Sequence, residues 1–126
     1  MQKEIIATTK APGAVGPYSQ GIAFDNLIFT SGQLPLDPAT GKLVEGGIAP
    51  STAQVIKNLQ AILEEAGSGL EKVIKATVFL KDMGDFAAMN EVYAEFFGGN
   101  PPARTTFGVG KLPMDAIVEI EAIAYK

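Results

Sequence analysis

The sequence predicts an α+β fold in which two helices cover one face of a mixed six-stranded sheet. Two segments carry apolar residues at helical spacing, and six shorter segments have the composition of strands. Strands both precede and follow each helix in the chain, which favours helices packed on one side of a sheet. With 126 residues, 47% of them hydrophobic, we expect one domain over residues 1–126.

Three strands are expected in the N-terminal third of the chain. The first is the short, Ile-rich segment 3–7. The next two are the apolar segments 22–24 and 27–31, which flank Asp25 and Asn26. Two turn-forming residues between two apolar segments predict a β-hairpin.

Both expected helices have recognisable ends. Ser51 as N-cap and Gln54 three residues later predict a capping box for the first helix, and Gly67 ends it. Asp82 or Asp85 is expected to cap the second helix. Its apolar side chains are predicted to enter the core: Phe86, Met89, Tyr93, Phe96 and Phe97.

The remaining strands lie in the C-terminal half, at 72–80, from Arg104 onward, and at 117–125. Alternation in the last strand places Glu119 and Glu121 on one face, roughly 7 Å apart. The same face carries three large apolar or aromatic residues: Ile117, Ile123 and Tyr125. A solvated surface is the simpler interpretation of two glutamates, but these neighbours favour a face that meets a cleft or another subunit.

Composition excludes several classes of function. The chain has no cysteine and no histidine, so disulfides, thiol chemistry, the most common general base and the most common zinc ligands are absent, and we expect no metal site. The net charge of −4 offers no basic footprint for nucleic acid. No apolar segment approaches the ~20 residues of a membrane helix, and the N-terminus lacks the apolar region of a signal peptide. We expect a cytoplasmic protein without a membrane partner.

The strongest candidate site combines Arg104 with the carboxylates of the last strand. Pro101 and Pro102 stiffen the approach to the arginine, because each fixes its own φ angle. We interpret the two strands as adjacent, rigid elements that deliver a cation and an anion together. Such a pair suits a site for a carboxylate substrate and a water molecule.

Four further positions have both a structural and a functional interpretation. Tyr18 either packs at the sheet edge with its hydroxyl in water or lines a site. Ser31 and Gly32 end a strand, where glycine permits either a bulge or the close approach of a ligand. Asn90 lies on or beside the apolar stripe of the second helix, so its amide either bonds to a loop or helps fix a ligand.

The order and spacing of these motifs resemble the RidA/YjgF family of reactive enamine/imine deaminases over essentially the whole chain. The motifs that carry the resemblance are Gly16-Pro17-Tyr18-Ser19-Gln20, Ser31-Gly32-Gln33-Leu34-Pro35, Asp37-Pro38-Ala39-Thr40-Gly41, the helix from Asp85-Phe86 through Asn90 to Tyr93, Pro102-Ala103-Arg104, Leu112-Pro113 and Val118-Glu119-Ile120-Glu121-Ala122.

This resemblance implies a fold like that of the trimeric, bacterial-type chorismate mutase. The expected assembly is a homotrimer whose sheets form a central barrel, with a site in each cleft between subunits. It also implies hydrolysis of 2-aminoacrylate and 2-iminobutanoate, which arise in pyridoxal-phosphate enzymes, to pyruvate and 2-oxobutanoate with release of ammonia. The partners would be small 2-imino and 2-oxo acids, and the resemblance implies no cofactor.

The resemblance also assigns roles to individual residues. Arg104 would pair with the substrate carboxylate, and Glu119 would position and activate the attacking water. Tyr18 would line the cleft. Three further expected site residues are Ser31 and Gly32, at a strand end beside the ligand, and Asn90, on the second helix.

One position departs from the family pattern. Thr106 stands where many members have cysteine, two residues after the arginine. The contribution of that cysteine can come from its backbone, so Thr106 is expected to keep the contact with substrate. Redox regulation through a thiol is not expected here.

Two other functions compete with the deaminase. A ligand-sensing regulatory protein could use the same cleft without turnover. A ribonuclease or translation inhibitor has been associated with some relatives, but the acidic balance and the absence of histidine argue against it.

Overall fold

A computed structural model describes residues 2–126. The strands are β1 (Glu4–Ile6), β2 (Gly21–Phe24), β3 (Leu27–Thr30), β4 (Val73–Leu80), β5 (Ala103–Gly108) and β6 (Val118–Tyr125). The α-helices are α1 (Ile48–Glu65) and α2 (Phe86–Phe97). Three short 3-10 helices lie at Leu70–Lys72, Met83–Asp85 and Pro113–Asp115.

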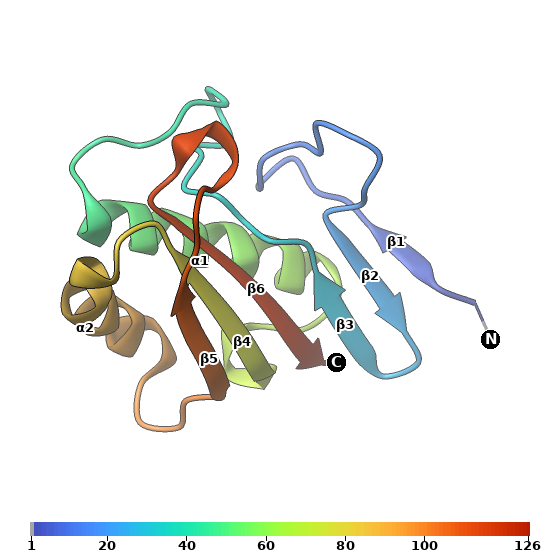
Figure 1. The fold of residues 1–126 in the computed structure, drawn as a ribbon. Coiled ribbons are helices and arrows are strands. Elements are labelled where there is room, and N and C mark those ends of the chain that lie inside the picture. The colour runs from blue at the N-terminus through green and yellow to red at the C-terminus, as the bar shows by residue number, and fades with distance from the viewer. Residues whose placement is uncertain (1) are drawn as a thin grey trace.

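The six strands form one sheet in the order β1-β2-β3-β6-β4-β5. Among the strand pairs of residues 2–126, only β4–β5 is parallel, and the connection between these two strands contains α2. Figure 1 shows both α-helices behind the sheet, with the opposite face left uncovered. The predicted α+β class, the mixed sheet and the placement of both helices on one face are confirmed.

The predicted hairpin is formed by β2 and β3, which pair from Gly21↔Thr30 to Phe24↔Leu27. Asp25 and Asn26 make the two-residue turn, and Asp25 adopts a φ of 56°. Aspartate tolerates this left-handed conformation better than most residues do.

The first helix begins earlier than the sequence predicts. Helix α1 starts at Ile48 with Gly47 as its N-cap, and no side chain caps it. The backbone N–H of Ser51 donates to the Gly47 carbonyl, so Ser51 lies inside the first turn and the predicted capping box is wrong. Pro50 fits the early start. The N–H groups of the first helical turn have no acceptor within the helix, so a proline, which lacks an N–H, is tolerated in that turn. The predicted end is confirmed, with Gly67 at a φ of +83°.

The second helix differs from its prediction in two details. The Asp82 side chain caps the 3-10 turn before α2 by accepting from the N–H of Gly84, whereas the Asp85 side chain makes no cap bond to α2. Phe86 was expected in the core, but it is 36% exposed. It is the first residue of α2, where the helix has only begun to pack against the body of the protein.

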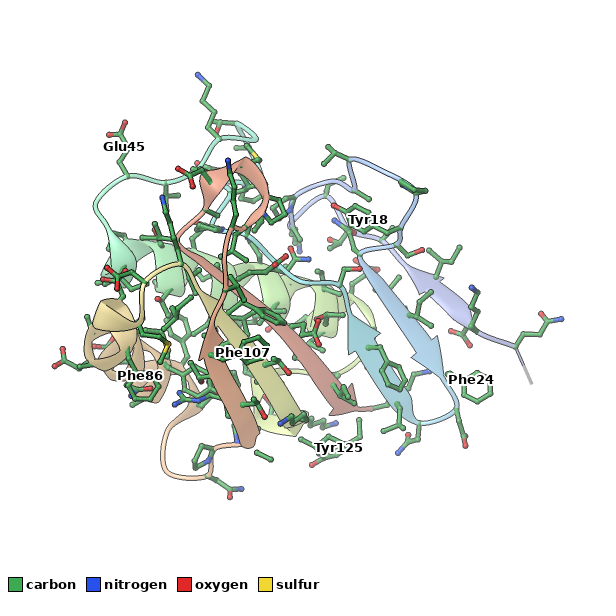
Figure 2. All side chains as sticks on the ribbon, in the orientation of Figure 1. Tyr18, Phe24, Glu45, Phe86, Phe107 and Tyr125 are labelled. Carbon is green, nitrogen blue, oxygen red and sulfur yellow. The ribbon has the colours of Figure 1, made fainter. Side chains whose placement is uncertain are left out.

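Strand β6 shows why the two faces of the sheet differ. Its burial alternates as predicted, with Val118, Ile120, Ala122 and Ala124 buried against the helices. The alternate residues point to the uncovered face. That face carries exposed aromatic and aliphatic side chains of several strands, some of them visible in Figure 2: Phe24, Leu27, Phe29, Phe107 and Tyr125. Exposed apolar surfaces of this kind are typical of interaction sites.

Two buried amide side chains fix the long loops. Gln20 donates to the carbonyls of Thr8, Ala11 and Pro12 and accepts from the N–H of Thr8. Asn58, on α1, donates to the carbonyls of Leu34 and Leu36 at 3.1 and 2.9 Å. Because a loop lacks the regular backbone pairing of a strand, these side chains supply the partners that its carbonyls need. Within residues 2–126, neither helix is long and apolar enough to cross a membrane.

We predict that Asn58→Leu lowers the free energy of unfolding by about 2–4 kcal/mol, because two carbonyls lose their donor inside the protein. Chemical denaturation measures this change. Gln60→Ala is the matched control on the same helix, since Gln60 forms only an exposed hydrogen bond to Glu64. An equal effect of the two substitutions would contradict the structural role of Asn58.

Candidate functional site

The predicted site residues form two groups at different places in the molecule. One group lies at the loop end of β2, β3 and β6, near Tyr18, and the other lies against α2. Figure 2 shows Tyr18 and Phe86, a first-turn residue of α2, far apart across the molecule. We call the groups the Glu119 half-site (Tyr18, Ser31, Gly32 and Glu119) and the Arg104 half-site (Asn90, Arg104 and Thr106).

The Glu119 half-site lines a cavity of ≈ 460 Å³. All four of its members border this cavity, together with the loop residues Pro12, Leu34, Leu36 and Met114. The side-chain hydroxyl of Ser31 donates to the carbonyl of Ser19, which ties the end of β3 to the Tyr18 loop. Tyr18 is half exposed, and its hydroxyl accepts a long hydrogen bond of 3.4 Å from the N–H of Val15.

Gly32 makes room for the Glu119 carboxylate. A Cβ atom at position 32 would lie 2.5 Å from Glu119 Oε2 and 2.9 Å from Cδ. The neighbouring Gln33 pairs with Ile120 through two backbone hydrogen bonds, so the loop cannot easily move away. A side chain at position 32 would therefore displace the Glu119 carboxylate from this position, so the glycine allows the predicted catalytic side chain to lie where it does.

The surroundings of Glu119 favour its neutral form. Burial raises the pKa of the Glu119 carboxyl, and the negative charge of Glu121 on the same face of β6 raises it further. A carboxylate with a raised pKa is a better proton acceptor at neutral pH than an exposed one. The predicted pairing of the two glutamates on one half-buried face is confirmed, with Glu121 the more exposed.

The Arg104 half-site is built on β5 and α2. Asn90 and Arg104 line a cavity of ≈ 350 Å³ together with Tyr93, Phe97 and Pro102. Arg104, the only arginine of the chain, lies with its Cζ atom 4.7 Å from the centroid of the Tyr93 ring. Within residues 2–126 it forms no salt bridge, because the one ion pair joins Lys81 to Asp115.

Two polar groups of this half-site have no partner in the described chain. The Thr106 Oγ1 atom is buried without a hydrogen bond, and Thr106 follows Arg104 on the same face of β5. Asn90 is half-buried, and no side-chain hydrogen bond joins it to another residue of the described range. Of the two interpretations of Asn90, a hydrogen bond from its amide to a loop is not found among the described residues, and the role in ligand binding stays a prediction.

The two half-sites face opposite sides of the sheet. Arg104 is in register with Ala76 of β4, which is buried under the helices, whereas Glu119 is in register with Phe79 on the uncovered side. Positions three apart on a strand point to opposite faces. The prediction of adjacent strands is also wrong, because β4 lies between β5 and β6. The sequence shows strand order along the chain, and here β6 inserts between β3 and β4.

Two aromatic neighbours of Arg104 were not predicted as site residues. Tyr93 and Phe86 were both expected in the core, yet their rings lie against the guanidinium group. Their spacing of seven residues on a helix was the available signal. In the described range, no group of three or more aspartates and glutamates is placed to hold a metal ion.

Comparison with known proteins identifies the family. The family described as Endoribonuclease L-PSP, which includes the RidA/YjgF proteins, matches residues 8–126. The chain belongs to the RidA/YjgF family. A RutC family protein of Pyrococcus abyssi is 56% identical over 100% of this chain and 99% of its own length. The 2-iminobutanoate/2-iminopropanoate deaminase of Mus musculus is 49% identical over 97% of this chain and 90% of its own.

Solved structures of the family share the fold. The structure of E. coli TdcF with bound serine superposes with a TM-score of 0.94, covers 98% of each chain and is 42% identical in sequence. The match includes every element that carries a predicted site residue, since it spans nearly all of the chain. The family assignment made from the sequence motifs is confirmed.

We predict that Glu121→Gln lowers the pKa of Glu119, because the substitution removes the negative charge that disfavours a second carboxylate nearby. Carboxyl-detected NMR titration measures the change. Glu64→Gln, on the exposed side of α1, is the control and should leave the Glu119 pKa unchanged. An unchanged Glu119 pKa in Glu121→Gln would show that burial alone sets its value.

Proposed function

We propose that this protein is an imine deaminase whose site forms between two copies of the chain. Arg104, Asn90 and Thr106 of one copy would face Tyr18, Ser31, Gly32 and Glu119 of another. The substrates would be 2-imino acids such as 2-iminobutanoate and 2-iminopropanoate, the latter in equilibrium with 2-aminoacrylate. The products would be the 2-oxo acids and ammonia.

The observation that carries this proposal is the separation of the two charged groups onto opposite faces of one sheet. Neither Arg104 nor Glu119 has a partner of opposite charge within residues 2–126. Each lines its own cavity, and the uncovered face beside Glu119 is apolar. A second copy placed against that face would cover it and would bring the two half-sites together. Three copies in a closed ring would leave no half-site unused.

Substrate binding would rest on Arg104. Its planar guanidinium can donate two parallel hydrogen bonds to a carboxylate, which fixes both the position and the orientation of the acid. The amide of Asn90 lines the same cavity as Arg104 and has free hydrogen-bonding capacity for the rest of the ligand. The Thr106 hydroxyl is buried and does not border this cavity, so Thr106 would contribute through its backbone. A lysine at position 104 would keep the charge but lose the paired geometry.

Hydrolysis would rest on Glu119. A water molecule held by this carboxylate attacks the carbon of the protonated imine and gives up a proton to Glu119, so a neutral carbinolamine forms. Glu119 then returns this proton to the nitrogen. As the C–N bond breaks and ammonia leaves, Glu119 takes up the proton of the hydroxyl group, so the C=O bond forms, and it passes that proton to ammonia or solvent. The imine carbon is already electrophilic, so positioning and one general base are sufficient without histidine.

The family relationship supports the reaction without deciding it. The mouse relative is named a deaminase, whereas the Pyrococcus relative, at higher identity, has only a family name. The serine bound in TdcF is an amino acid, and therefore also a small carboxylate. Thr106 in place of the common cysteine leaves the backbone of β5 in position and removes thiol chemistry.

We predict that Arg104→Ala and Arg104→Lys reduce kcat/KM by about 10²-fold or more, because both lose the bidentate pair. The assay couples a threonine dehydratase to this protein and follows 2-oxobutanoate at alkaline pH, where we expect spontaneous hydrolysis to be slow. Lys57→Ala, an exposed change on α1, is the control. Full activity in Arg104→Ala would rule out the proposed role of the arginine.

A second prediction tests whether the site is shared. Glu119→Gln should reduce kcat by about 10²-fold or more through loss of the base. Co-expression of Arg104→Ala with Glu119→Gln should then restore activity, because about one quarter of randomly mixed interfaces contain both intact side chains. Two differently tagged Arg104→Ala chains form the control and should stay inactive. No recovery in a verified mixed oligomer would contradict a site between copies.

A ligand-sensing protein is the second candidate function. It is favoured by the two unpartnered half-sites, which could bind a 2-oxo acid without turning it over. Tight 2-oxobutanoate binding without acceleration of imine hydrolysis would select this function. The ribonuclease suggested by the family description has less support, since the net charge is −4 and histidine is absent.

A further inference from the structure

The guanidinium of Arg104 lies against two aromatic rings of α2. Its Cζ atom is 4.7 Å from the ring centroid of Tyr93 and 5.6 Å from that of Phe86. These two residues are seven positions apart, or about two helical turns, so they project from the same side of α2. We call this pair of rings the aromatic clamp.

The clamp is the strongest restraint on this side chain that the described residues provide. An arginine side chain has several rotatable bonds, and holding it in one geometry costs conformational entropy. Within residues 2–126 no carboxylate forms a salt bridge to Arg104, and its guanidinium donates no hydrogen bond to another residue. On the side facing α2 the guanidinium therefore contacts aromatic rings, and no carboxylate of the described residues balances its positive charge.

We propose that Phe86 and Tyr93 are positioning residues that hold Arg104 ready for the substrate carboxylate. This inference rests on the proposed function and deepens it. A ring face attracts the cation through its quadrupole and consumes none of the five N–H donors. A carboxylate in the same place would also fix the arginine, but it would occupy the donors that the substrate needs. Aromatic rings thus restrain the guanidinium and leave its hydrogen-bonding edge free.

The two rings are held in different ways. Tyr93 is 5% exposed and packs on Phe97, with ring centroids 4.5 Å apart, so its ring has a fixed position in the core. Phe86 is 36% exposed and contributes little to the core. Phe86 can therefore be changed with little effect on folding, which makes it the cleaner position for a test.

The ring of Tyr93, rather than its hydroxyl, makes the contact with Arg104. The Tyr93 hydroxyl is buried and has no hydrogen-bond partner in the structure. Its removal should therefore leave the clamp intact. Tyr93→Phe and Phe86→Tyr both keep a ring at each position, and they are the matched controls for substitutions that remove one.

The decisive experiment compares Phe86→Leu and Tyr93→Leu with these two controls in the coupled deaminase assay. Loss of either ring is expected to raise KM about three- to tenfold, in line with a cation–π contact, while kcat changes less than about twofold. The ring-retaining variants should raise KM less than the leucine variants do, and Lys57→Ala, an exposed change on α1 outside both half-sites, should match the wild type in both constants. Thermal unfolding of each variant identifies any that fail to fold. If Tyr93→Leu does not fold, Phe86→Leu alone still decides the test.

The outcomes separate the clamp from the proposed function. An unchanged KM in folded, active Phe86→Leu overturns the clamp. If the wild type does not accelerate imine hydrolysis, the deaminase proposal fails, and the affinity for 2-oxobutanoate, measured by calorimetry, decides the clamp instead. Weaker binding by the same three- to tenfold factor in Phe86→Leu supports it. Equal affinity in the two proteins, or no binding by the wild type, overturns it.

Discussion

The pairing of β4 between β5 and β6 determines where the charged groups of this protein can act. Side chains alternate along each strand, so the register that aligns Arg104 with Ala76 and Glu119 with Phe79 sends them to opposite faces. A shift of one residue in either pairing would move one of them to the other side and would also expose the buried residues of that strand. The hydrophobic core therefore fixes the separation of the two half-sites.

Because the two half-sites are separated, the uncovered face of the sheet bears both on association and on completion of the proposed site. Its aromatic and aliphatic side chains would favour association on hydrophobic grounds alone. Because Glu119 lies at the edge of the same face, an association that covers the apolar residues also determines what approaches the carboxylate. In the proposed assembly, the burial that stabilises the oligomer and the geometry that completes the site have the same cause.

The sequence was sufficient for the elements and for the faces of β6, since both depend on local periodicity and on turn-forming residues. It was not sufficient for three features that depend on contacts between distant segments. The insertion of β6 next to β4 separated Arg104 from Glu119, and Pro50 allowed α1 to begin before Ser51. The room that Gly32 leaves for the Glu119 carboxylate is visible only when the two segments lie side by side. Periodicity likewise placed Phe86 and Tyr93 on one stripe but did not show that a cation lies against it.

The electrostatics of the two half-sites favour binding of the substrate carboxylate to Arg104 before Glu119 acts as a base. A free Arg104 brought close to Glu119 would lower the pKa of this carboxyl and weaken it as a base. A substrate carboxylate that pairs with Arg104 neutralises this influence, and burial together with Glu121 then keeps the pKa of Glu119 raised. Occupation of the arginine would thus increase the basicity of the glutamate. In the proposed assembly the base would be more effective when an acid is bound, so the raised pKa of Glu119 and the unpaired charge of Arg104 would serve the same proposed reaction.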